Sequence, residues 1–298
     1  MSKSKSTIGV SEHSAKKHER IEGLSHMIAT QHRQGKRASE PKCSEIVFVD
    51  VMCGSGIYHT TFRDKLRHEM VGSPLRQIRG FKKSITKISK GEAIGINQQF
   101  PVSFRFSDKD QQNINLLKGC CHTELKDIPE VALDIQQQDA TKVLTELRKE
   151  VVANPHKVYV VTVDPNNLKE YPDAAVWKLI KASHKSENLF LILNIPTNID
   201  RGYDFYNSDY FKEKGFKRRV KSIKKLQRLG LDKTFENVMY IMFRNETNIY
   251  GSVDAYGDYR FMTMCYWGGK VQLPRNAWEA HKMYRLTEMF KEVERKLA

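Results

Sequence analysis

The residues best suited to chemistry in this sequence follow one apolar run. Residues 46–50 are apolar up to a final carboxylate, Asp50, and the loop that comes next contains Cys53, Gly54 and Gly56. Glycines let a ligand approach the backbone closely, and a carboxylate at the end of a strand can bind the charged amino acid portion of a cofactor. The loop therefore predicts a cofactor pocket, although a Gly-x-Gly turn is equally typical of a tight connection between a strand and a helix.

Two further carboxylates follow later apolar runs. Asp108 comes after residues 102–106, and Asp139, with Ala140 behind it, comes after residues 131–135. Asp108 offers two acceptor oxygens to the hydroxyls of a ribose, and Asp139 could accept a hydrogen bond from an adenine amino group. Each could instead cap a helix. Three carboxylates at three successive strand ends favour a single shared ligand.

A strongly basic segment lies later in the chain. Between Lys212 and Arg228, nine of 17 residues are Lys or Arg, and the formal net charge of the whole protein is +15. Apolar residues recur there at helical spacing, so the opposite face of the predicted helix is cationic. That face could bind a phosphate backbone or could be a solvated surface. The candidate phosphate contacts are Lys217, Arg218, Arg219, Lys221, Lys224, Lys225 and Arg228.

Five apolar runs define the predicted strands that position the candidate residues. They are residues 46–50, 102–106, 131–135, 158–163 and 189–193. Helical patterns lie between them, for example at 140–152 and 174–183. This alternation predicts a doubly wound α/β fold with a mostly parallel central sheet and helices on both faces. In such sheets ligands bind beyond the carboxyl ends of the strands, where the polar residues fall.

The remaining segments are arranged around this sheet. Residues 1–44 are predicted to be a basic lead-in with a helix at 15–34, and residues 45–298 to form the α/β domain, with 57–101 and 199–237 as insertions. Two late β runs, 238–243 and 259–266, are expected to pair as an antiparallel hairpin at the sheet edge. An amphipathic helix is expected over 277–297.

Composition limits the classes of protein that remain. The hydrophobic share of 40% and the charged share of 29% are typical of a globular chain. No apolar run approaches the roughly 18 residues of a membrane span, and no secretory signal is recognisable, so we expect a soluble cytoplasmic protein. The five cysteines form no CxxC pair and are expected to be reduced, and no metal site is predicted. The positive charge makes nucleic acid the first partner to consider.

Several motifs, taken in order, resemble one known family. They are Phe48-Val-Asp-Val-Met-Cys-Gly-Ser-Gly56, Gly72-Ser-Pro-Leu75, Asp108-Lys-Asp110, Gln138-Asp-Ala140 and Val163-Asp-Pro165. This order is similar to that of the three-Cys-motif partner proteins, and the Lys17-His18 pair ahead of the first strand also resembles their N-terminal segment. The resemblance implies the class I methyltransferase fold, a Rossmann-like fold, with S-adenosylmethionine as the cofactor.

The resemblance also implies roles for individual residues. Asp50, Cys53, Gly54 and Gly56 would line the methionine end of the cofactor, Asp108 the ribose, and Asp139 with Ala140 the adenine. In related methyltransferases the end of the fourth strand faces the methyl acceptor, which here means Asp164 and Pro165. The turn continues as Asn166-Asn167 and lacks the aromatic residue that stacks an acceptor base. Asn194, at the end of the fifth strand, could position a substrate or cap its own loop.

Two functions of different classes follow. The first is an S-adenosylmethionine-dependent methyltransferase acting on DNA or RNA, with Asp164, Pro165 and Asn194 beside the methyl acceptor. The second is a catalytically inactive subunit with this fold, which serves as the protein partner in a larger nucleic-acid-processing or defence complex; the altered turn at Asp164 favours it. A nucleotide-dependent enzyme of Rossmann type fits less well, because the loop lacks the full G-x-G-x-x-G and no Walker lysine follows.

Overall fold

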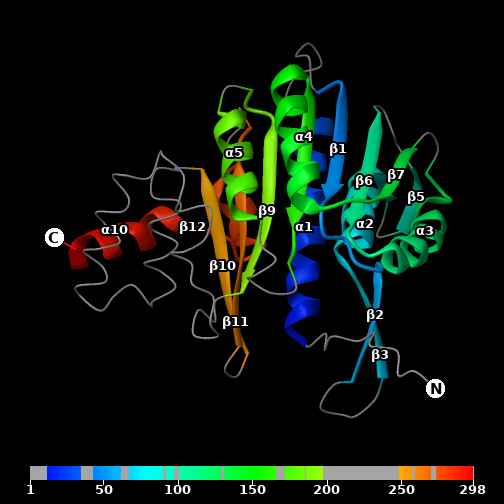
Figure 1. Cartoon of the computed structure of the whole chain (residues 1–298), viewed down its shortest axis with the longest axis horizontal. Coiled ribbons are helices and arrows are strands. Elements are labelled where there is room, and N and C mark those ends of the chain that lie inside the picture. Colours follow the sequence, from blue (N-terminus) through cyan, green and yellow to red (C-terminus); the bar gives the residue numbers. More distant parts are fainter. Residues whose placement is uncertain are drawn as a thin grey trace.

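The computed structural model describes residues 12–34, 43–61, 67–89, 92–96, 101–128, 131–165, 172–184, 186–196, 248–256, 259–269 and 273–297. At its centre is an eight-stranded sheet with the strand order β12-β10-β11-β9-β8-β1-β6-β7 (Figure 1). The strands are β1 (Glu45–Asp50), β6 (Val102–Asp108), β7 (Val131–Gln137), β8 (Lys157–Val163), β9 (Leu189–Pro196), β10 (Ile249–Tyr256), β11 (Tyr259–Trp267) and β12 (Tyr284–Arg285).

The strand directions define the fold class. The pairs β1–β6, β6–β7, β1–β8 and β8–β9 are all parallel. Beyond β9, the strand β11 runs antiparallel both to β9 and to β10, which places an antiparallel hairpin at one end of a parallel sheet. All five strands expected from the apolar runs are present. The predicted Rossmann-like class I methyltransferase fold is confirmed.

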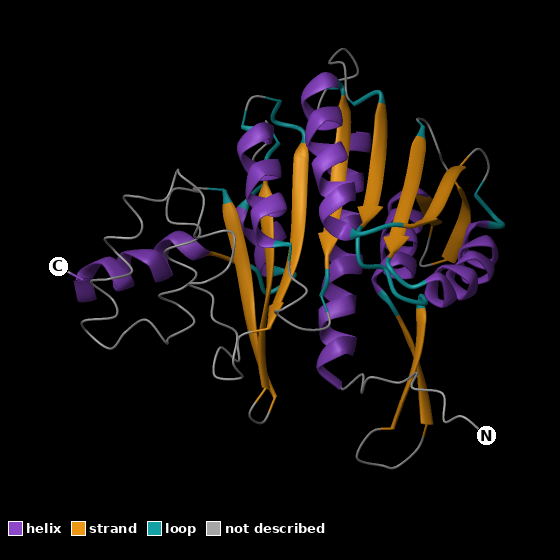
Figure 2. Cartoon of the chain, viewed as in Figure 1, coloured by secondary structure: helices purple, strands orange, loops and turns teal. Residues whose placement is uncertain are grey.

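Helices cover both faces of the sheet (Figure 2). One face carries α1 (Glu12–Gln34), α2 (Ser73–Ile85) and α3 (Gln111–Leu125), and the other carries α4 (Ala140–Ala153) and α5 (Asp173–Ser183). Successive side chains of a strand point to opposite faces. Along β1, Ile46 and Phe48 therefore pack in the cluster that contains α1 and α2, whereas Val47 and Val49 pack in the cluster that contains α4 and α5.

The N-terminal helix α1 is part of the core of one face. Its residues Ile21, Leu24 and Ile28 are fully buried, in agreement with the helix expected over 15–34. It lies against α2 at Gly80, where a Cβ atom would overlap the carbonyl oxygen of Glu22. The two helices therefore approach each other closely, and α1 holds a fixed position relative to the sheet.

Residues 57–101, predicted as an insertion, contain α2 between two small antiparallel hairpins. The first pairs β2 (Ile57–Thr61) with β3 (Arg67–Val71), and the second pairs β4 (Thr86–Ser89) with β5 (Glu92–Ile96). Pro74 occupies the first turn of α2, where a missing N–H is tolerated. Because α2 follows β1 and precedes β6, it is the helix of the crossover between these two parallel strands.

The edge hairpin differs from the sequence prediction. The partner of β11 is β10, and β10 lies in the stretch that was expected to be the connection of the hairpin. The Gly, Asn and Asp residues of this stretch favoured a loop, but Ile249, Tyr250 and Val253 are of residue types that are enriched in strands, and residues 249–256 pair with β11. The run at 238–243 lies outside the described residues.

The C-terminal segment also differs from the single helix that was predicted. It forms a short α9 (Arg275–Glu279), the two-residue β12, and α10 (Leu286–Leu297). Lys282 has a left-handed φ of 55°, which no α-helix accommodates, so the helical pattern is interrupted there. Among the helices in the described ranges, none is both long and apolar enough to span a membrane. The predicted insertion at 199–237 lies outside the described residues.

Candidate functional site

The strand order reverses between β1 and β8, because β6 and β7 lie on one side of this pair and β9 on the other. In open α/β sheets, ligands bind outside the carboxyl ends of the strands at such a point. Asp50 ends β1 and is in register with Thr162, two residues before Asp164. By the alternation of each strand, Asp50, Asp108, Asp164 and Asn194 share the face that carries α1 and α2.

The loop after β1 depends on its two glycines. Gly54 and Gly56 have φ values of 59° and 80°, in the left-handed region that other residues rarely adopt. A side chain at Gly54 would overlap the hydroxyl group of Tyr58. The backbone N–H of Gly72 donates to the carbonyl oxygen of Gly56 over 2.7 Å, so the start of α2 is fastened to the loop. The predicted Gly72-Ser-Pro-Leu75 segment thus supports the glycine loop directly.

Asp50 is a buried carboxyl group without a full set of partners. Its exposed fraction is 0%, and Oδ1 accepts a hydrogen bond of 3.1 Å from the backbone N–H of Met52. Oδ2 is buried and has no hydrogen-bond partner among the residues that the structure describes. Burial raises the pKa of Asp50 to about 7, against the opposing effects of the Ser73 side chain and the Met52 N–H. A buried oxygen without a donor is rare in proteins and is well suited to a donor supplied by a ligand.

Asp108 holds the glycine loop to the end of β6. Its Oδ2 accepts from the backbone N–H of Gly54 over 2.9 Å, and its Oδ1 accepts from the N–H of Asp110 over 2.8 Å and from Nδ2 of Asn113 over 3.2 Å. The side chain is only partly buried. A carboxylate has about four acceptor positions, so three hydrogen bonds leave capacity for a further donor.

Cys53 belongs to the loop after β1, and Asp139 and Ala140 lie where α4 begins after β7. Cys53 is buried, and burial raises the pKa of its thiol, which therefore stays neutral and packs as an apolar side chain. Asp139 caps α4, since its Oδ1 accepts from the N–H groups of Thr141 and Lys142. Ala140 is the first residue of that helix and is nearly buried. The sequence left open whether Asp139 caps a helix, and the structure shows that it does.

Asp164 is paired with two side chains from α1. Lys17 Nζ lies 2.6 Å from Oδ1, and His18 Nε2 lies 3.3 Å from Oδ2. Burial alone would raise the pKa of Asp164, but the Lys17 ammonium and the hydrogen bond from His18 outweigh it and lower that pKa to about 2. Sequence reasoning noted Lys17-His18 only as part of a resemblance, because nothing local connects a helix to a strand end about 150 residues later.

Tyr58, a residue that sequence reasoning missed, connects this ion pair to the glycine loop. Its ring stacks on the imidazole of His18 with a centroid separation of 6.0 Å and an interplanar angle of 21°. Its hydroxyl group lies against Gly54. Burial, together with Asp164 and Asp50, raises the pKa of Tyr58 well above its usual value, so the phenol stays protonated. An aromatic residue soon after a glycine loop was the only sequence signal for it.

The fourth and fifth strand ends contribute Pro165 and Asn194. Both are buried. Oδ1 of Asn194 accepts a hydrogen bond of 2.9 Å from the hydroxyl group of Thr263, whereas its Nδ2 is buried and has no partner within the described ranges. Asn194 therefore presents a second unsatisfied polar atom at this end of the sheet. The predicted nucleic-acid contacts, Lys217, Arg218, Arg219, Lys221, Lys224, Lys225 and Arg228, lie outside the described residues.

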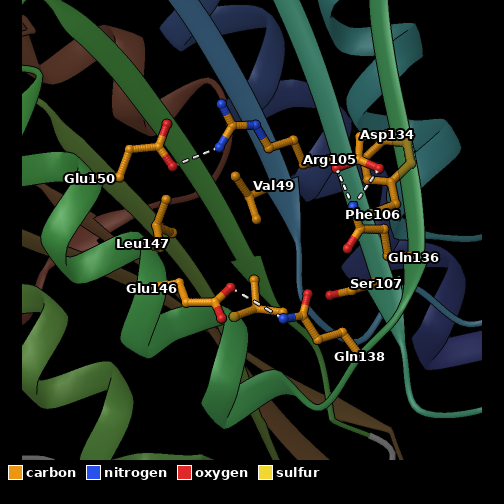
Figure 3. A pocket seen from close by; sticks show the side chains of 11 residues that line it. Val49, Arg105, Phe106, Ser107, Asp134, Gln136, Gln138, Glu146, Leu147 and Glu150 are labelled. Carbon is orange, nitrogen blue, oxygen red and sulfur yellow. Dashed lines mark hydrogen bonds and ion pairs between the residues drawn. The ribbon is translucent and has the colours of Figure 1, made fainter.

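A polar groove lies on the opposite face of the sheet, between β6, β7 and α4 (Figure 3). Its polar side chains are paired with one another: Arg105 with Glu150, Gln136 with Asp134, and Gln138 with Glu146. It includes neither Asp50 nor the glycine loop. The groove is therefore separate from the cluster at the strand ends, which has unsatisfied polar atoms.

Comparison with known proteins yields only distant similarities. No protein-family model matches the sequence, and no curated protein matches it significantly. Among solved structures, magnesium protoporphyrin IX methyltransferase from Synechocystis PCC 6803 with bound SAH is 11% identical with a TM-score of 0.37, over 84% of this chain and 82% of that chain. An O-methyltransferase from Bacillus cereus in complex with SAH is 7% identical with a TM-score of 0.36, over 83% and 80%.

A third similar structure is the human methyltransferase 10 domain containing protein, which is 9% identical with a TM-score of 0.30, over 83% of this chain and 81% of that chain. Scores this low carry no argument about function. The fold class rests on the order and direction of the strands in this chain. The resemblance to the three-Cys-motif partner proteins stays a prediction.

Proposed function

We propose that the protein is an S-adenosylmethionine-dependent methyltransferase that acts on nucleic acid. The observation that carries the proposal is the unpartnered Oδ2 of Asp50, buried beside a left-handed glycine loop at the point where the strand order reverses. An ammonium group would give this oxygen its missing donor. The amino acid portion of S-adenosylmethionine carries such a group.

The residues at the strand ends fit this cofactor in chemical type. Asp50, Cys53, Gly54 and Gly56 would hold its methionine portion, Asp108 its ribose hydroxyls, and Asp139 with Ala140 its adenine. When bound, S-adenosylmethionine supplies a methyl group on a positively charged sulfur, and the electron pair of the broken bond stays on that sulfur. The protein's contribution would be chiefly to orient the acceptor and the cofactor for an in-line displacement.

The acceptor would lie beside Asp164, Pro165 and Asn194. The unpartnered Nδ2 of Asn194 supports this placement, because it offers a hydrogen-bond donor at the next strand end. The formal net charge of +15 supports a polyanionic substrate. The predicted cationic face between Lys212 and Arg228 would contact its phosphates.

Calorimetry with S-adenosylhomocysteine tests the cofactor half of this proposal. The parent protein is expected to bind it, and Asp108→Asn to weaken binding by about 1–3 kcal/mol. In Asp108→Asn an amide NH₂ group replaces one carboxylate oxygen. In either position it would face an N–H donor, that of Gly54 or those of Asp110 and Asn113, in place of a ligand hydroxyl. Asp110→Asn is the matched control, since Asn caps a helix as well as Asp does, and Asp110 serves as the cap of α3. No heat of binding to the parent protein would refute the proposal.

Transfer of a radiolabelled methyl group to mixed DNA and RNA tests the substrate half. Incorporation that is lost in Asp164→Asn, while S-adenosylhomocysteine still binds, supports an enzyme with its acceptor at this strand end. Digestion to nucleosides then identifies the methylated atom.

One observation favours the second candidate, a binding subunit without transferase activity. Both oxygens of Asp164 are already occupied by Lys17 and His18, so this carboxylate is not free to bind an acceptor amine in the way implied by the resemblance. The absence of methyl incorporation by a parent protein that binds S-adenosylhomocysteine would support this candidate.

A further inference from the structure

His18 has one ring nitrogen with a partner and one without. Its exposed fraction is 3%, so almost none of the ring reaches solvent. Nε2 faces Oδ2 of Asp164, and Nδ1 is buried with no hydrogen-bond partner in the described part of the chain. Leaving a buried polar atom unsatisfied costs about 1–3 kcal/mol. Nδ1 of His18 lies among the polar residues at the strand ends, where a ligand is expected. An unsatisfied atom in this position indicates that it acts on a ligand.

The contact with Asp164 determines which nitrogen carries the proton. With a pKa of about 2, Asp164 is ionised at neutral pH and can only accept hydrogen bonds. Nε2 must therefore be the protonated nitrogen that donates to it. In the neutral ring this leaves Nδ1 with its lone pair free, which is the form that can take up a proton.

Lys17 keeps the carboxylate in this arrangement. Its ammonium group lies on Oδ1 of Asp164, so the other oxygen remains directed at His18. Tyr58 stacks on the imidazole and reaches Gly54 with its hydroxyl group. Only one aromatic ring therefore separates His18 from the loop proposed to hold the reactive cofactor.

We propose that His18 is the general base of the transfer reaction, that Asp164 is its positioning residue, and that the methyl acceptor is a hydroxyl or N–H group that must lose a proton. This inference rests on the proposed function. It gives Asp164 a role that is compatible with having both oxygens occupied. An acceptor nitrogen with a free lone pair, such as N7 of guanine, would need no such base.

In this step the proton of the acceptor's O–H or N–H group moves to Nδ1 of His18. The electron pair of the broken bond remains on the acceptor atom, which becomes methylated. The imidazolium that results is stabilised by the ionised Asp164. It returns to the neutral form by releasing the proton to solvent after the product leaves.

The surroundings of His18 keep it neutral before the reaction. Burial lowers the pKa of its imidazole, the hydrogen bond to Asp164 opposes this, and the positive charges of Lys17 on α1 and Arg76 on α2 lower it further. The phenol of Tyr58, on β2, is neutral. The base is therefore available at neutral pH and is lost only when the pH falls below a pKa that is itself under 6.5.

The first test measures the protonation of His18 without any substrate. The full chain is labelled with ¹⁵N-histidine, and the signal of His18 among the ten histidines is assigned by its absence in His18→Gln. At pH 7.5 we expect a neutral ring with the proton on Nε2 and a bare Nδ1. In Asp164→Asn the pKa of His18 should fall further, because the carboxylate that favours the charged ring is gone. A proton on Nδ1, or a charged ring at pH 7.5, would overturn the inference.

The second test separates the base from the fold and from cofactor binding. His18→Gln keeps an N–H donor for Asp164 but has no basic nitrogen, and His32→Gln is the same change on the same helix, at a residue bonded to the Ile28 carbonyl oxygen. We expect His18→Gln to bind S-adenosylhomocysteine within twofold of the parent, and to transfer labelled methyl groups to mixed DNA and RNA at least 100-fold more slowly. His32→Gln should keep the parental rate.

The outcomes separate the two proposals. Transfer by His18→Gln within fivefold of the parent rate would refute the base, while leaving the methyltransferase proposal intact. Absence of S-adenosylhomocysteine binding by the parent would refute the methyltransferase proposal itself. If the parent binds this compound but methylates neither nucleic acid, the candidate without transferase activity is supported, and the role of His18 as a general base is refuted.

Discussion

Asp50 and Asp164 lie at the ends of two adjacent parallel strands and are both buried, yet their pKa values differ in opposite directions from the usual value. The pKa of Asp50 is raised to about 7, whereas that of Asp164 is lowered to about 2. Burial raises the pKa in both cases. The difference comes from the partners: Asp164 has Lys17 and His18, and Asp50 has only neutral donors, Met52 N–H and Ser73.

The protein itself provides the positive partner of the Asp164 carboxylate, whereas it leaves the Asp50 carboxyl group available for a ligand. The protein supplies the positive charge at Asp164 from its own N-terminal helix. Among the described residues, none supplies the corresponding positive charge at Asp50, and the ammonium group of the proposed cofactor would provide it.

The largest expected effect is on the Asp164 side. Asp164→Ala leaves Lys17 without its partner in a largely buried position, so we expect the free energy of unfolding to fall by about 3–5 kcal/mol. Urea denaturation at pH 7 measures this. Glu150→Gln, which removes the charge of a half-exposed ion pair with Arg105, is the control and should lose about 1 kcal/mol or less. Equal losses in both variants would contradict the special status of Asp164.

The pH dependence of the parent protein provides a second check on Asp164. Because its pKa is lower in the folded than in the unfolded protein, the stability it contributes is present above about pH 4 and is lost as the pH falls toward about 2. Asp164→Ala should therefore show a smaller loss of stability over this acid range.

An intermediate effect is expected at the loop beside Asp50. Gly54→Ala forces a side chain into a left-handed conformation and against Tyr58, so we expect a loss of about 2 kcal/mol in stability and of most S-adenosylhomocysteine binding. Thermal unfolding and calorimetry measure the two quantities. Gly119→Ala, in α3 with open space around the added Cβ, should instead gain up to about 1 kcal/mol. If Gly54→Ala changed neither the stability nor the binding of S-adenosylhomocysteine, the loop would tolerate other conformations.

The smallest expected effect is at Asp50 itself, where a substitution is expected to stabilise the protein. The pKa of Asp50 is higher in the folded protein, so the stability contributed by its neutral form is fully present below about pH 4 and is lost as the pH rises through about 7. Asp50→Asn stays neutral, and at pH 8 it should stabilise the protein by about 1–2 kcal/mol while weakening S-adenosylhomocysteine binding at least tenfold. Denaturation at pH 4 and pH 8 should show that the gain disappears at the lower pH.

Asp134→Asn is the control for this last change, because Asp134 is exposed on β7 and bonded to Gln136. Its stability and its affinity for S-adenosylhomocysteine should remain close to those of the parent at both pH values. A destabilised Asp50→Asn at pH 8 would show that Asp50 has a charged partner after all.

The sequence predicted those features that depend on local patterns. The five parallel strands, the helix that begins after Asp139, and the polar residues at the strand ends all follow from apolar runs and capping residues. The glycine loop was also visible, and the structure adds its left-handed backbone. These features were predictable because the determining residues are neighbours in the chain.

Features that depend on distant residues were not predictable from a single sequence. The pairing of His18 with Asp164 joins residues 146 positions apart, and the stacking of Tyr58 on His18 also brings together two segments that are far apart in the chain. The edge hairpin was predicted with the wrong first strand, because residues 249–256, which were expected to belong to the connecting loop, pair with β11 through their backbone. Tertiary contacts outweigh local preference in each case.

The long sequence separation between α1 and Asp164 also has a consequence for synthesis of the protein. Lys17 leaves the ribosome about 147 residues before its carboxylate partner, a delay on the order of ten seconds at usual translation rates. During this interval the nascent helix can dock on α2, which emerges earlier, but its charged end has no counterion. Completion of the ion pair is therefore expected to be a late event in folding, after β8 has joined the sheet.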